Sequence, residues 1–499
     1  MAPHASRGRT SGCGTSARNR KVPGTEPEAG PLLTILRDAP WLTSGRARAW
    51  CRVIAFLCIV LTVLRWGLIA FGVEFLGDVR NVDFTSFWTA SELALRGHPD
   101  WAYQPERHAA AQQSLPGATK GYAAFFYPPV YLLLCLPLAL VGFLPSLAIW
   151  LFLTGAAWIA VIRRWLPAQA GWLPVLAFPP AWNNFWHGQN GFVSAALLGA
   201  GALALDRRPF IAGLWFGCLS FKPQLALVVG PALLAARRWS AIAGAVTSAT
   251  LLAGASWLIF GRGTWIAFLA NTALARQALE DELVGSAKMQ SVFAAIRLLG
   301  GSVGSAYATQ LMVSVPVIIV TMAIAAQRPG GMAEGALMAA ASMLASPFLL
   351  DYDLVLLSLP MAWLLTMAAR DGFLPWEKLA LAAVFPLALI SRSVAQRYGI
   401  PVTPINVPCV PGCRRATGCA VRPLGQRQFS GRAQIGVQFR IAAVAIDDNH
   451  AIATLPRHRR REIEGFPRPQ HPFAQPIVTA RASLRVREHR DRGHGPTIA

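Results

Sequence analysis

The chain has 499 residues, of which 54% are hydrophobic and only 14% are charged. Soluble domains carry about 25% charged residues, so this composition excludes an ordinary soluble domain and predicts an all-α integral membrane protein with several spans. The net charge of +22 does not indicate nucleic-acid binding, because basic residues beside spans are expected from the positive-inside rule and from anionic lipids.

The N-terminal segment, residues 1–48, is rich in Arg, Ser, Gly and Thr, and we expect it to be disordered. Residues 51–73 form the first predicted span, and we expect no cleavable signal peptide because an early apolar stretch is missing. Four arginines lie before or at the start of this span, namely Arg37, Arg46, Arg48 and Arg52. Their position predicts a cytoplasmic N-terminus.

The body of the chain, residues 51–392, is predicted to be one polytopic membrane domain with room for about ten spans of about 20 residues each. Two polar segments interrupt it, at 74–127 and 261–305, and both are expected to face outward as loops over the bundle. Together they predict a roofed site at the outer membrane surface. The candidate spans after the first loop are 128–142, 146–162, 172–183, 191–205, 209–221, 223–236, 240–260, 306–326, 333–349, 354–369 and 377–391.

Paired arginines constrain this topology. Lys222-Pro223 is expected to divide 209–236 into two half-helices, so that the basic pairs at 207–208 and 237–238 both face the cytoplasm. If 128–142 and 146–162 both cross, however, the pair at 163–164 emerges outside, against the same rule. One segment must therefore be re-entrant or miscounted, and the sequence does not decide which.

The tail, residues 405–499, differs abruptly from the rest. It holds 16 Arg, 6 acidic residues and no Lys, Trp, Tyr or Met, and it lacks apolar periodicity, so we expect it to be disordered. It resembles out-of-frame translation of a GC-rich gene. We hypothesise a frameshift near 402–408, which resequencing the gene would test. The C-x3-C-x5-C spacing of its cysteines is not a usual zinc pattern, and no metal site or cofactor is expected.

A carboxylate stands among aromatics in NVDFTSFWTA (81–90). Phe84, Phe87 and Trp88 recur at helical spacing after Asp83, which predicts a Trp-rich helix along the membrane interface with Asp83 at its start. One interpretation makes Asp83 a general base above the bilayer. The other makes it only the cap of that helix.

Further polar residues stand at predicted span boundaries. Lys222 interrupts an apolar stretch, where a buried Lys is costly and by default functional. WHGQNGFVSAALLGAG (186–201) places its polar residues just before a span, where they either line a cavity or merely start a helix. The candidates for substrate binding are Gln189, Asn190, Lys222, Lys288, Gln290, Arg297, Tyr352 and Asp353. His187 precedes Gln189 and Asn190 in the same motif.

An ordered set of motifs resembles glycosyltransferase family 87, of the GT-C class. These motifs are V-D-F-x-x-F-W-x-A after the first span, RGHPDWAYQP, YPPV, GQNGFVSAALLGAG, LSFKPQLAL, KMQSVFAAIRLLGG and ASPFLLDYDLVLLSLP, and they cover about 51–392. The resemblance implies a GT-C helical fold and an inverting hexosyltransferase. Such an enzyme takes a sugar, typically mannose, from a polyprenyl phosphate and passes it to a glycan or glycolipid acceptor.

In that resemblance an outer-loop carboxylate is the general base, which maps to Asp83, with Asp78 as the runner-up. The family often has His after its S-P motif, where this chain has D-Y-D at 351–353. Without that histidine, the resemblance implies that another cation contacts the donor phosphate, and the candidates are Lys222, Lys288 and Arg297. The Ala-, Arg- and Gly-rich composition suggests a GC-rich bacterium, and hence a multi-pass protein of the inner (plasma) membrane with an extracytoplasmic site.

Other functions remain open. A transporter or lipid-linked sugar flippase also has broken helices and a buried Lys, but it predicts inverted repeats, which the sequence does not display. A non-catalytic assembly protein has no reason to group acids, Lys and Gln on one face. No Walker loop, HExxH, GxSxG or Rossmann pattern occurs in a supporting context, which disfavours soluble nucleotide-using enzymes.

Overall fold

A computed structural model describes residues 31–70, 83–115, 122–282, 285 and 287–401. All of them belong to one compact unit, and within them the chain forms helices and no β-strand. Most of the predicted disordered N-terminal segment, Asp78 and the tail 405–499 lie outside the described residues. Residues 31–48 are described, and much of that stretch is helical, where disorder was expected.

The helices follow one another with short connections. In chain order they are α1 (Pro31–Asp38), α2 (Ser44–Ala70), α3 (Phe84–Leu95), η2 (Pro99–Tyr103), α4 (Pro105–Gln113), α5 (Pro129–Cys135), η3 (Leu138–Leu140), α6 (Phe143–Trp165), η4 (Ala168–Ala170), α7 (Leu173–Leu176), α8 (Pro179–His187), α9 (Gly191–Ala204), α10 (Pro209–Gly217), η5 (Cys218–Phe221), α11 (Pro223–Ala235), α12 (Trp239–Glu280), α13 (Val292–Leu298), α14 (Val303–Ala325), α15 (Gly331–Ala345), η6 (Asp351–Leu357), α16 (Ser358–Asp371) and α17 (Glu377–Tyr398).

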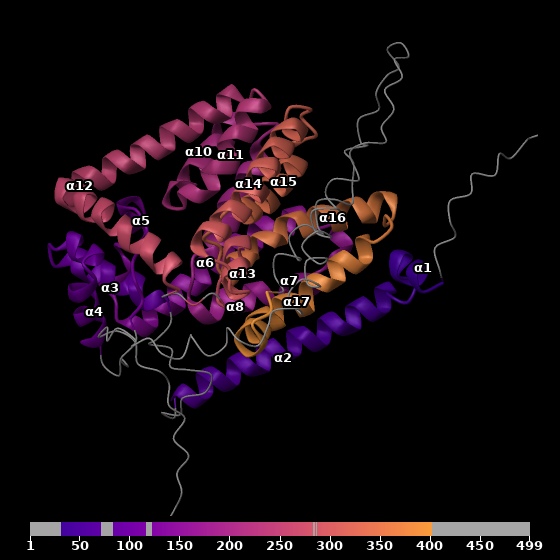
Figure 1. Cartoon of the computed structure of the whole chain (residues 1–499), viewed down its shortest axis with the longest axis horizontal. Coiled ribbons are helices and arrows are strands. Elements are labelled where there is room, and N and C mark those ends of the chain that lie inside the picture. The colour runs from indigo at the N-terminus through magenta and orange to yellow at the C-terminus, as the bar shows by residue number, and fades with distance from the viewer. Residues whose placement is uncertain (1–30, 71–82, 116–121, 283–284, 286, 402–499) are drawn as a thin grey trace, which may run out of the picture. The chain divides into compact units, whose positions relative to one another are not determined.

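Among the described residues, six helical stretches are long and apolar enough to cross a membrane, which supports an all-α membrane protein. They are α2, α6, α12, α14, η6 with α16, and α17. Most of the other predicted spans correspond to shorter apolar helices such as α9, α11 and α15. The predicted span 172–183 is instead divided between the short helices α7 and α8. The shorter apolar helices pack within the same bundle, where α10, α11, α14 and α15 gather beside one arm of α12 (Figure 1). The prediction of a helical membrane protein is therefore supported, whereas the predicted number of about ten spans is not confirmed.

The predicted span 128–142 is wrong. The chain there forms only α5, of seven residues, and the single turn η3, which together rise about 15 Å against a hydrocarbon core of about 30 Å. Both segments instead pack on α3: the Trp88 indole donates to the carbonyl of Val141, and the Ser91 hydroxyl donates to the carbonyl of Leu136. Pro137, which lies between α5 and η3, keeps this stretch from continuing as one helix.

Helix α3 is also more buried than the predicted interfacial helix. Nine of its twelve residues are buried. The Phe87 ring lies 5.1 Å from Tyr131 and 6.1 Å from Trp150, measured between centroids. A helix surrounded by protein on most sides is held by packing rather than by the lipid interface. The start of α3 is therefore fixed relative to α5 and α6.

One end of the bundle is rich in arginine. Arg238, just after α11, contacts Asp206 at 2.8 Å and the fully buried Glu334 at 2.6 Å. Arg328 donates to the carbonyl of Ala236 at 2.7 Å. These contacts join the start of α10, the end of α11 and the start of α15, as the half-helix interpretation of 209–236 predicts. We call this region the arginine end.

The remaining arginine pair, Arg163 and Arg164, closes α6 and lies toward the same end. The neighbouring Trp165 indole donates to Gly199 late in α9, and its ring faces Gly335 near the start of α15. The other end of α6 meets α3, where the rings of Phe143 and Phe84 are 5.6 Å apart. If 128–142 does not cross the membrane, α6 runs from the α3 side to the arginine end. Arg163 and Arg164 then lie on the same side as the other two basic pairs, as the positive-inside rule predicts.

The segment 261–305 is not a loop throughout. Helix α12 continues to Glu280 and only bends at Gly261, whose φ of 76° is non-helical, and Figure 1 shows the two arms of α12 diverging. Glycine adopts this conformation without the strain that a side chain would add. Helix α13 and the start of α14 also belong to this segment, so much of the predicted loop is helical.

Close packing of α10 on α12 leads to the first testable prediction. A Cβ added at Gly244 would overlap the carbonyl oxygen of Phe210, whereas one added at Gly254, on the same helix, would meet no atom. We expect Gly244→Ala to cost about 1–3 kcal/mol of stability through overpacking and Gly254→Ala to be neutral or slightly stabilising. Thermal unfolding of both variants in one detergent measures this, and equal melting temperatures would contradict it.

Candidate active site

Asp83 lies at the start of α3 and faces residues far away in the chain. Lys288 Nζ is 3.2 Å from Asp83 Oδ1 and 3.1 Å from Oδ2, and Gln189 Nε2 donates to Oδ2 at 3.1 Å. The Asp83 carboxylate makes no capping hydrogen bond to α3. The interpretation of Asp83 as a mere helix cap is therefore wrong.

His187 and Arg392 extend this contact. The Nδ1 atom of His187 lies 3.7 Å from Asp83 Oδ2, and its Nε2 atom lies 3.3 Å from an Arg392 nitrogen. The same Arg392 nitrogen is 3.4 Å from Asp351 Oδ2. Because Arg392 belongs to α17, the last described helix reaches the same site as α3 and α8.

A second ion pair lies deeper. Lys222 Nζ is 2.5 Å from Asp353 Oδ1, and both side chains are less than a tenth exposed. The ring of Tyr352 connects the two pairs, since its centroid is 5.9 Å from Lys222 Nζ and 5.8 Å from Lys288 Nζ. Cations near an aromatic face are attracted to its π-electrons. We call this whole set the polar cluster: Asp83, His187, Gln189, Lys222, Lys288, Asp351, Tyr352, Asp353 and Arg392.

Backbone contacts hold the segments of the polar cluster together. Met289 and Leu350 form an isolated antiparallel bridge. In addition, the backbone N–H of Gln290 donates to the Leu349 carbonyl at 2.7 Å. This pairing places Lys288 beside the 351–353 segment although about sixty residues separate them. A lysine on an otherwise irregular connection is thereby positioned by the backbone.

The G-Q-N-G sequence at 188–191 depends on its glycines. Gly188 has a left-handed φ of 64°, and a Cβ there would meet Phe84 at 2.6 Å. A Cβ at Gly191 would meet the Tyr352 carbonyl oxygen at 2.7 Å. Only glycine fits both places. The turn between α8 and α9 can therefore approach the polar cluster and present Gln189 to Asp83.

The charges around Asp83 favour its ionised form. Burial alone would raise the pKa of Asp83, but the charges of Lys288 and His187, together with hydrogen bonds from Gln189 and Lys288, hold that pKa below its usual value. Burial lowers the pKa of His187 and outweighs the opposing charges of Asp83 and Asp351, while Lys288 and Arg392 add smaller lowering effects. At neutral pH the cluster thus presents a carboxylate beside a neutral imidazole.

The cluster remains accessible at Asp83. About a fifth of the side chains of Asp83 (22%), Lys288 (19%) and His187 (21%) is exposed. An ionised carboxylate at a partly open position can accept a proton from a hydroxyl group. The adjacent ammonium can bind a phosphate oxygen. This combination suits group transfer between a phosphate-linked donor and a hydroxyl acceptor.

Comparison with known families assigns a class of enzyme. Residues 125–347 match the family model of glycosyltransferase family 87. These residues are a glycosyltransferase family 87 domain. No curated protein and no solved structure shows significant similarity to the chain. The family and the six long apolar helices together identify a membrane glycosyltransferase, which acts on a sugar donor and an acceptor.

The family-87 domain contains one side of the polar cluster, with His187, Gln189, Lys222 and Lys288. Asp83, the 351–353 segment and Arg392 lie outside the matched residues. The match therefore assigns the class of enzyme, while the geometry of the described residues joins the flanking segments to the domain.

The structure brings together most, but not all, of the sequence candidates. Asp83, Gln189, Lys222, Lys288, Tyr352 and Asp353 meet in the polar cluster. Asn190 is fully buried beside Gln189, and the side-chain amide of the buried Gln290 donates to the carbonyl of Lys288 at 3.5 Å. Arg297 lies elsewhere: it binds Glu282 at 3.0 Å and the carbonyl of Gly301 at 2.9 Å. These partners indicate that Arg297 stabilises the connection between α12 and α14 rather than contacting a substrate.

Arg392 and Asp351 were not selected from the sequence. Arg392 follows directly after the predicted span 377–391, where a basic residue is typical of a span boundary, although α17 continues past it to Tyr398. Asp351 was considered only as a feature of a span boundary. Neither pattern indicates which partner the charge meets, because that partner lies on another helix. Among the described residues, no group of three His, Cys, Asp or Glu is arranged to hold a metal ion.

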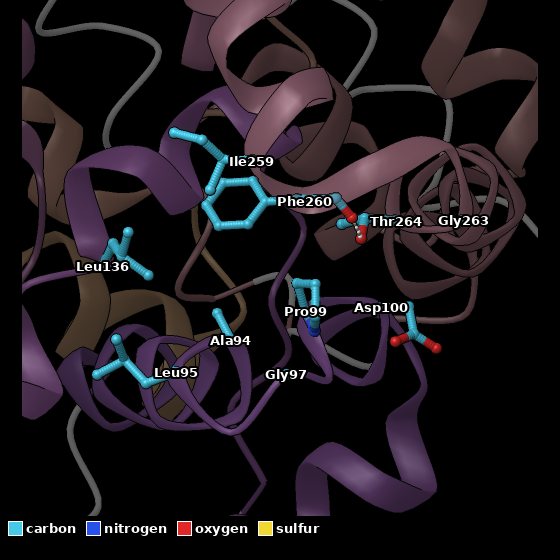
Figure 2. Close-up of a pocket in the computed structure, with 10 residues that line it drawn as sticks. All are labelled: Ala94, Leu95, Gly97, Pro99, Asp100, Leu136, Ile259, Phe260, Gly263 and Thr264. Carbon is cyan, nitrogen blue, oxygen red and sulfur yellow. Dashed lines mark hydrogen bonds between the residues drawn. The ribbon is translucent and has the colours of Figure 1, made fainter.

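A separate pocket of about 470 Å³ lies at the other end of α3. Figure 2 shows Ile259 and Phe260 of α12 near Leu136, with Ala94, Leu95 and Pro99 below and Asp100 to one side. The twelve residues of α3 separate this pocket from Asp83 by about 18 Å. Its lining does not include a member of the polar cluster.

Proposed function

We propose that this membrane glycosyltransferase transfers a hexose, which we take to be mannose, from a polyprenyl-phosphate sugar to a hydroxyl of a glycan or glycolipid acceptor, with inversion. The observation that carries the proposal is the pairing of the partly exposed Asp83 carboxylate with Lys288 beside the family-87 domain. Asp83 is the general base, and Lys288 binds the donor phosphate.

A sugar hydroxyl is a weak nucleophile and needs a base within hydrogen-bonding reach. Asp83 meets the requirement for charge, because its pKa is held low and it is ionised at neutral pH. Its position also suits the reaction, since packing fixes the start of α3. Asp83 is therefore the proposed acceptor of the hydroxyl proton, and Asp78 remains the alternative acid of the same loop.

The reaction balances as a single displacement. The acceptor oxygen forms a bond to the anomeric carbon while the bond from that carbon to the phosphate oxygen breaks. The hydroxyl proton moves to Asp83, and the bond electrons leave with the polyprenyl phosphate. Lys288 stabilises the charge on the leaving phosphate. Attack from the face opposite the phosphate inverts the anomeric centre.

Before the donor binds, Lys288 contacts both oxygens of Asp83. A phosphate that draws the ammonium toward itself removes a charge that weakens the base. We infer that donor binding raises the basicity of Asp83, so that the carboxylate becomes an effective base only when the donor is present. Gln189 and Asn190, on the turn before α9, are the proposed contacts to sugar hydroxyls, with Tyr352 beside them.

The orientation follows from the arginine end. Lys222 and Arg238 stand at opposite ends of α11, which has 13 residues and is about 20 Å long. The positive-inside rule places the arginine end in the cytoplasm, so the polar cluster faces outward, as a lipid-linked donor on the outer leaflet requires. The same rule places the N-terminus in the cytoplasm, and we assign the protein to the inner (plasma) membrane.

The donor class is testable with the full chain in liposomes. We expect labelled mannose to be transferred from polyprenyl-phosphate mannose, but not from GDP-mannose, to octyl mannoside or to a membrane lipid extract. The anomeric configuration of the product is then read by NMR. Transfer from the nucleotide sugar, or retention of configuration, would contradict the proposal. Movement of the labelled lipid across the bilayer without transfer would instead identify a flippase.

A further inference from the structure

His187 lies between a carboxylate and a guanidinium. Its Nδ1 atom is 3.7 Å from Asp83 Oδ2, and its Nε2 atom is 3.3 Å from Arg392. These two contacts involve opposite nitrogens of one imidazole. The protonation of each nitrogen therefore decides what the ring can do for Asp83.

The chemistry of the neighbours determines that protonation. A guanidinium has only N–H donors and no acceptor, so the nitrogen that faces Arg392 must carry the lone pair. The remaining nitrogen of a neutral imidazole carries the hydrogen. We infer that Arg392 is a positioning residue that holds His187 as the neutral tautomer with its Nδ1–H directed at Asp83. The tautomer of His187 follows from its contacts alone, and only the consequence for catalysis rests on the proposed function, in which Asp83 is the base.

Other charges around His187 come from every element packed on α8. Their effects oppose one another, because the acids favour an imidazolium and the bases disfavour it. They are Asp83 before α3, Lys288 before α13, Asp351 and Tyr352 of η6, Arg392 of α17, and Arg65 of α2, which donates to the carbonyl of Trp186. Helix α9 contributes no titratable side chain.

The two oxygens of Asp83 become unequal in this arrangement. Oδ2 faces Lys288, Gln189 and His187, whereas Oδ1 contacts only Lys288 among the described residues. Neutral donors on Oδ2 fix the plane of the carboxylate without removing its charge. When Lys288 turns to a phosphate, Oδ1 is the oxygen left to accept the acceptor's proton.

A simpler interpretation makes Arg392 only the counter-ion of the buried Asp351, from which it is 3.4 Å away. The two interpretations differ in what Arg392 does to His187. If charge balance of Asp351 is the whole role, removing Arg392 leaves the histidine tautomer unchanged. If Arg392 selects the tautomer, the imidazole responds and Asp351→Asn does not reproduce that response.

The deciding experiment is histidine NMR on the full chain in nanodiscs, with ring-¹⁵N histidine and with His187→Gln to assign the signal. We expect a protonated Nδ1, a bare Nε2 and a pKa below the ordinary value of about 6.5 in the wild type. Arg392→Lys should preserve this state, since Lys also only donates. Arg392→Met should raise the pKa and mix the tautomers. A protonated Nε2 in the wild type would overturn the inference even if no variant folds.

Sugar transfer provides an independent readout. We expect Arg392→Met to lower kcat about 10- to 100-fold through misplacement of the base, with the acid limb of the pH profile moved to higher pH and KM little changed. The sign follows because losing a positive neighbour raises the pKa of His187. A wild type that shows the expected tautomer but no transfer would reject the proposed function and keep the positioning role. Unchanged tautomer and pH profile in Arg392→Met would reject the positioning role alone.

Discussion

Asp83→Asn is expected to abolish sugar transfer, with a loss of about 10²–10⁴-fold in kcat, the contribution of a positioned general base. Asparagine has nearly the size of aspartate, so packing at the start of α3 is preserved. Its amide cannot accept a proton at neutral pH, and it no longer neutralises Lys288, which contacts both oxygens of Asp83 at 3.1 to 3.2 Å. The loss should therefore appear in kcat rather than in folding.

The matched control is Asp78→Asn, in the same loop. We expect it to retain transfer, because the proposed base is Asp83, which the described residues pair with Lys288. Donor binding measured with polyprenyl phosphate should persist in Asp83→Asn, since the phosphate contact is assigned to Lys288. If Asp78→Asn is the inactive variant and Asp83→Asn the active one, the assignment of the base is wrong.

The pH dependence of the wild type has a definite sign. Because Lys288 and His187 hold the pKa of Asp83 below its usual value, the carboxylate stays ionised to lower pH than an exposed aspartate. In the donor-free enzyme, which kcat/KM reports, the Asp83 charge should therefore be lost only as pH drops through that lowered pKa, below the acid limb that His187 sets. Lys288→Met should raise this pKa and move the loss to higher pH.

Breaking the deep ion pair is expected to produce the largest effect on stability. Lys222→Met leaves the Asp353 carboxylate, which is only 6% exposed as a residue, without the ammonium that lies 2.5 Å away. Removing one partner of a buried pair costs about 3–5 kcal/mol, because the remaining charge stays buried and unpaired. We expect a clear drop in the thermal unfolding temperature in detergent.

Two variants test the cause of that drop. The double variant Lys222→Met with Asp353→Leu should recover much of the stability, since an apolar replacement of the whole pair is often tolerated. Arg276→Gln breaks the exposed pair with Glu280, in which the arginine side chain is 74% exposed, and should change little because water screens such pairs. A stable Lys222→Met would show that the pair is not a source of stability.

Local sequence features were enough to predict the class of the molecule and several parts of the site. A low charge content and long apolar stretches predict a helical membrane protein, because burying an apolar helix needs only composition and length. The ordered motifs indicated family 87, and the carboxylate of NVDFTSFWTA suggested a base. Lys222 was a candidate because it is a charge in an apolar stretch, and Lys288 because it is a cation in the second polar segment.

The tertiary structure decided which of these residues meet. Nothing local to Asp83 specifies Lys288, which lies 205 residues away, or separates it from Arg297, which braces its own loop instead. Likewise 128–142 is apolar enough for a span, yet its contacts with α3 keep it on one side of the bundle, and this alone lets α6 carry Arg163 and Arg164 to the arginine end. The hydropathy of a segment indicates whether that segment prefers lipid or water. Contacts between distant segments depend instead on complementary shape and charge on two segments, and these become neighbours only in the folded chain.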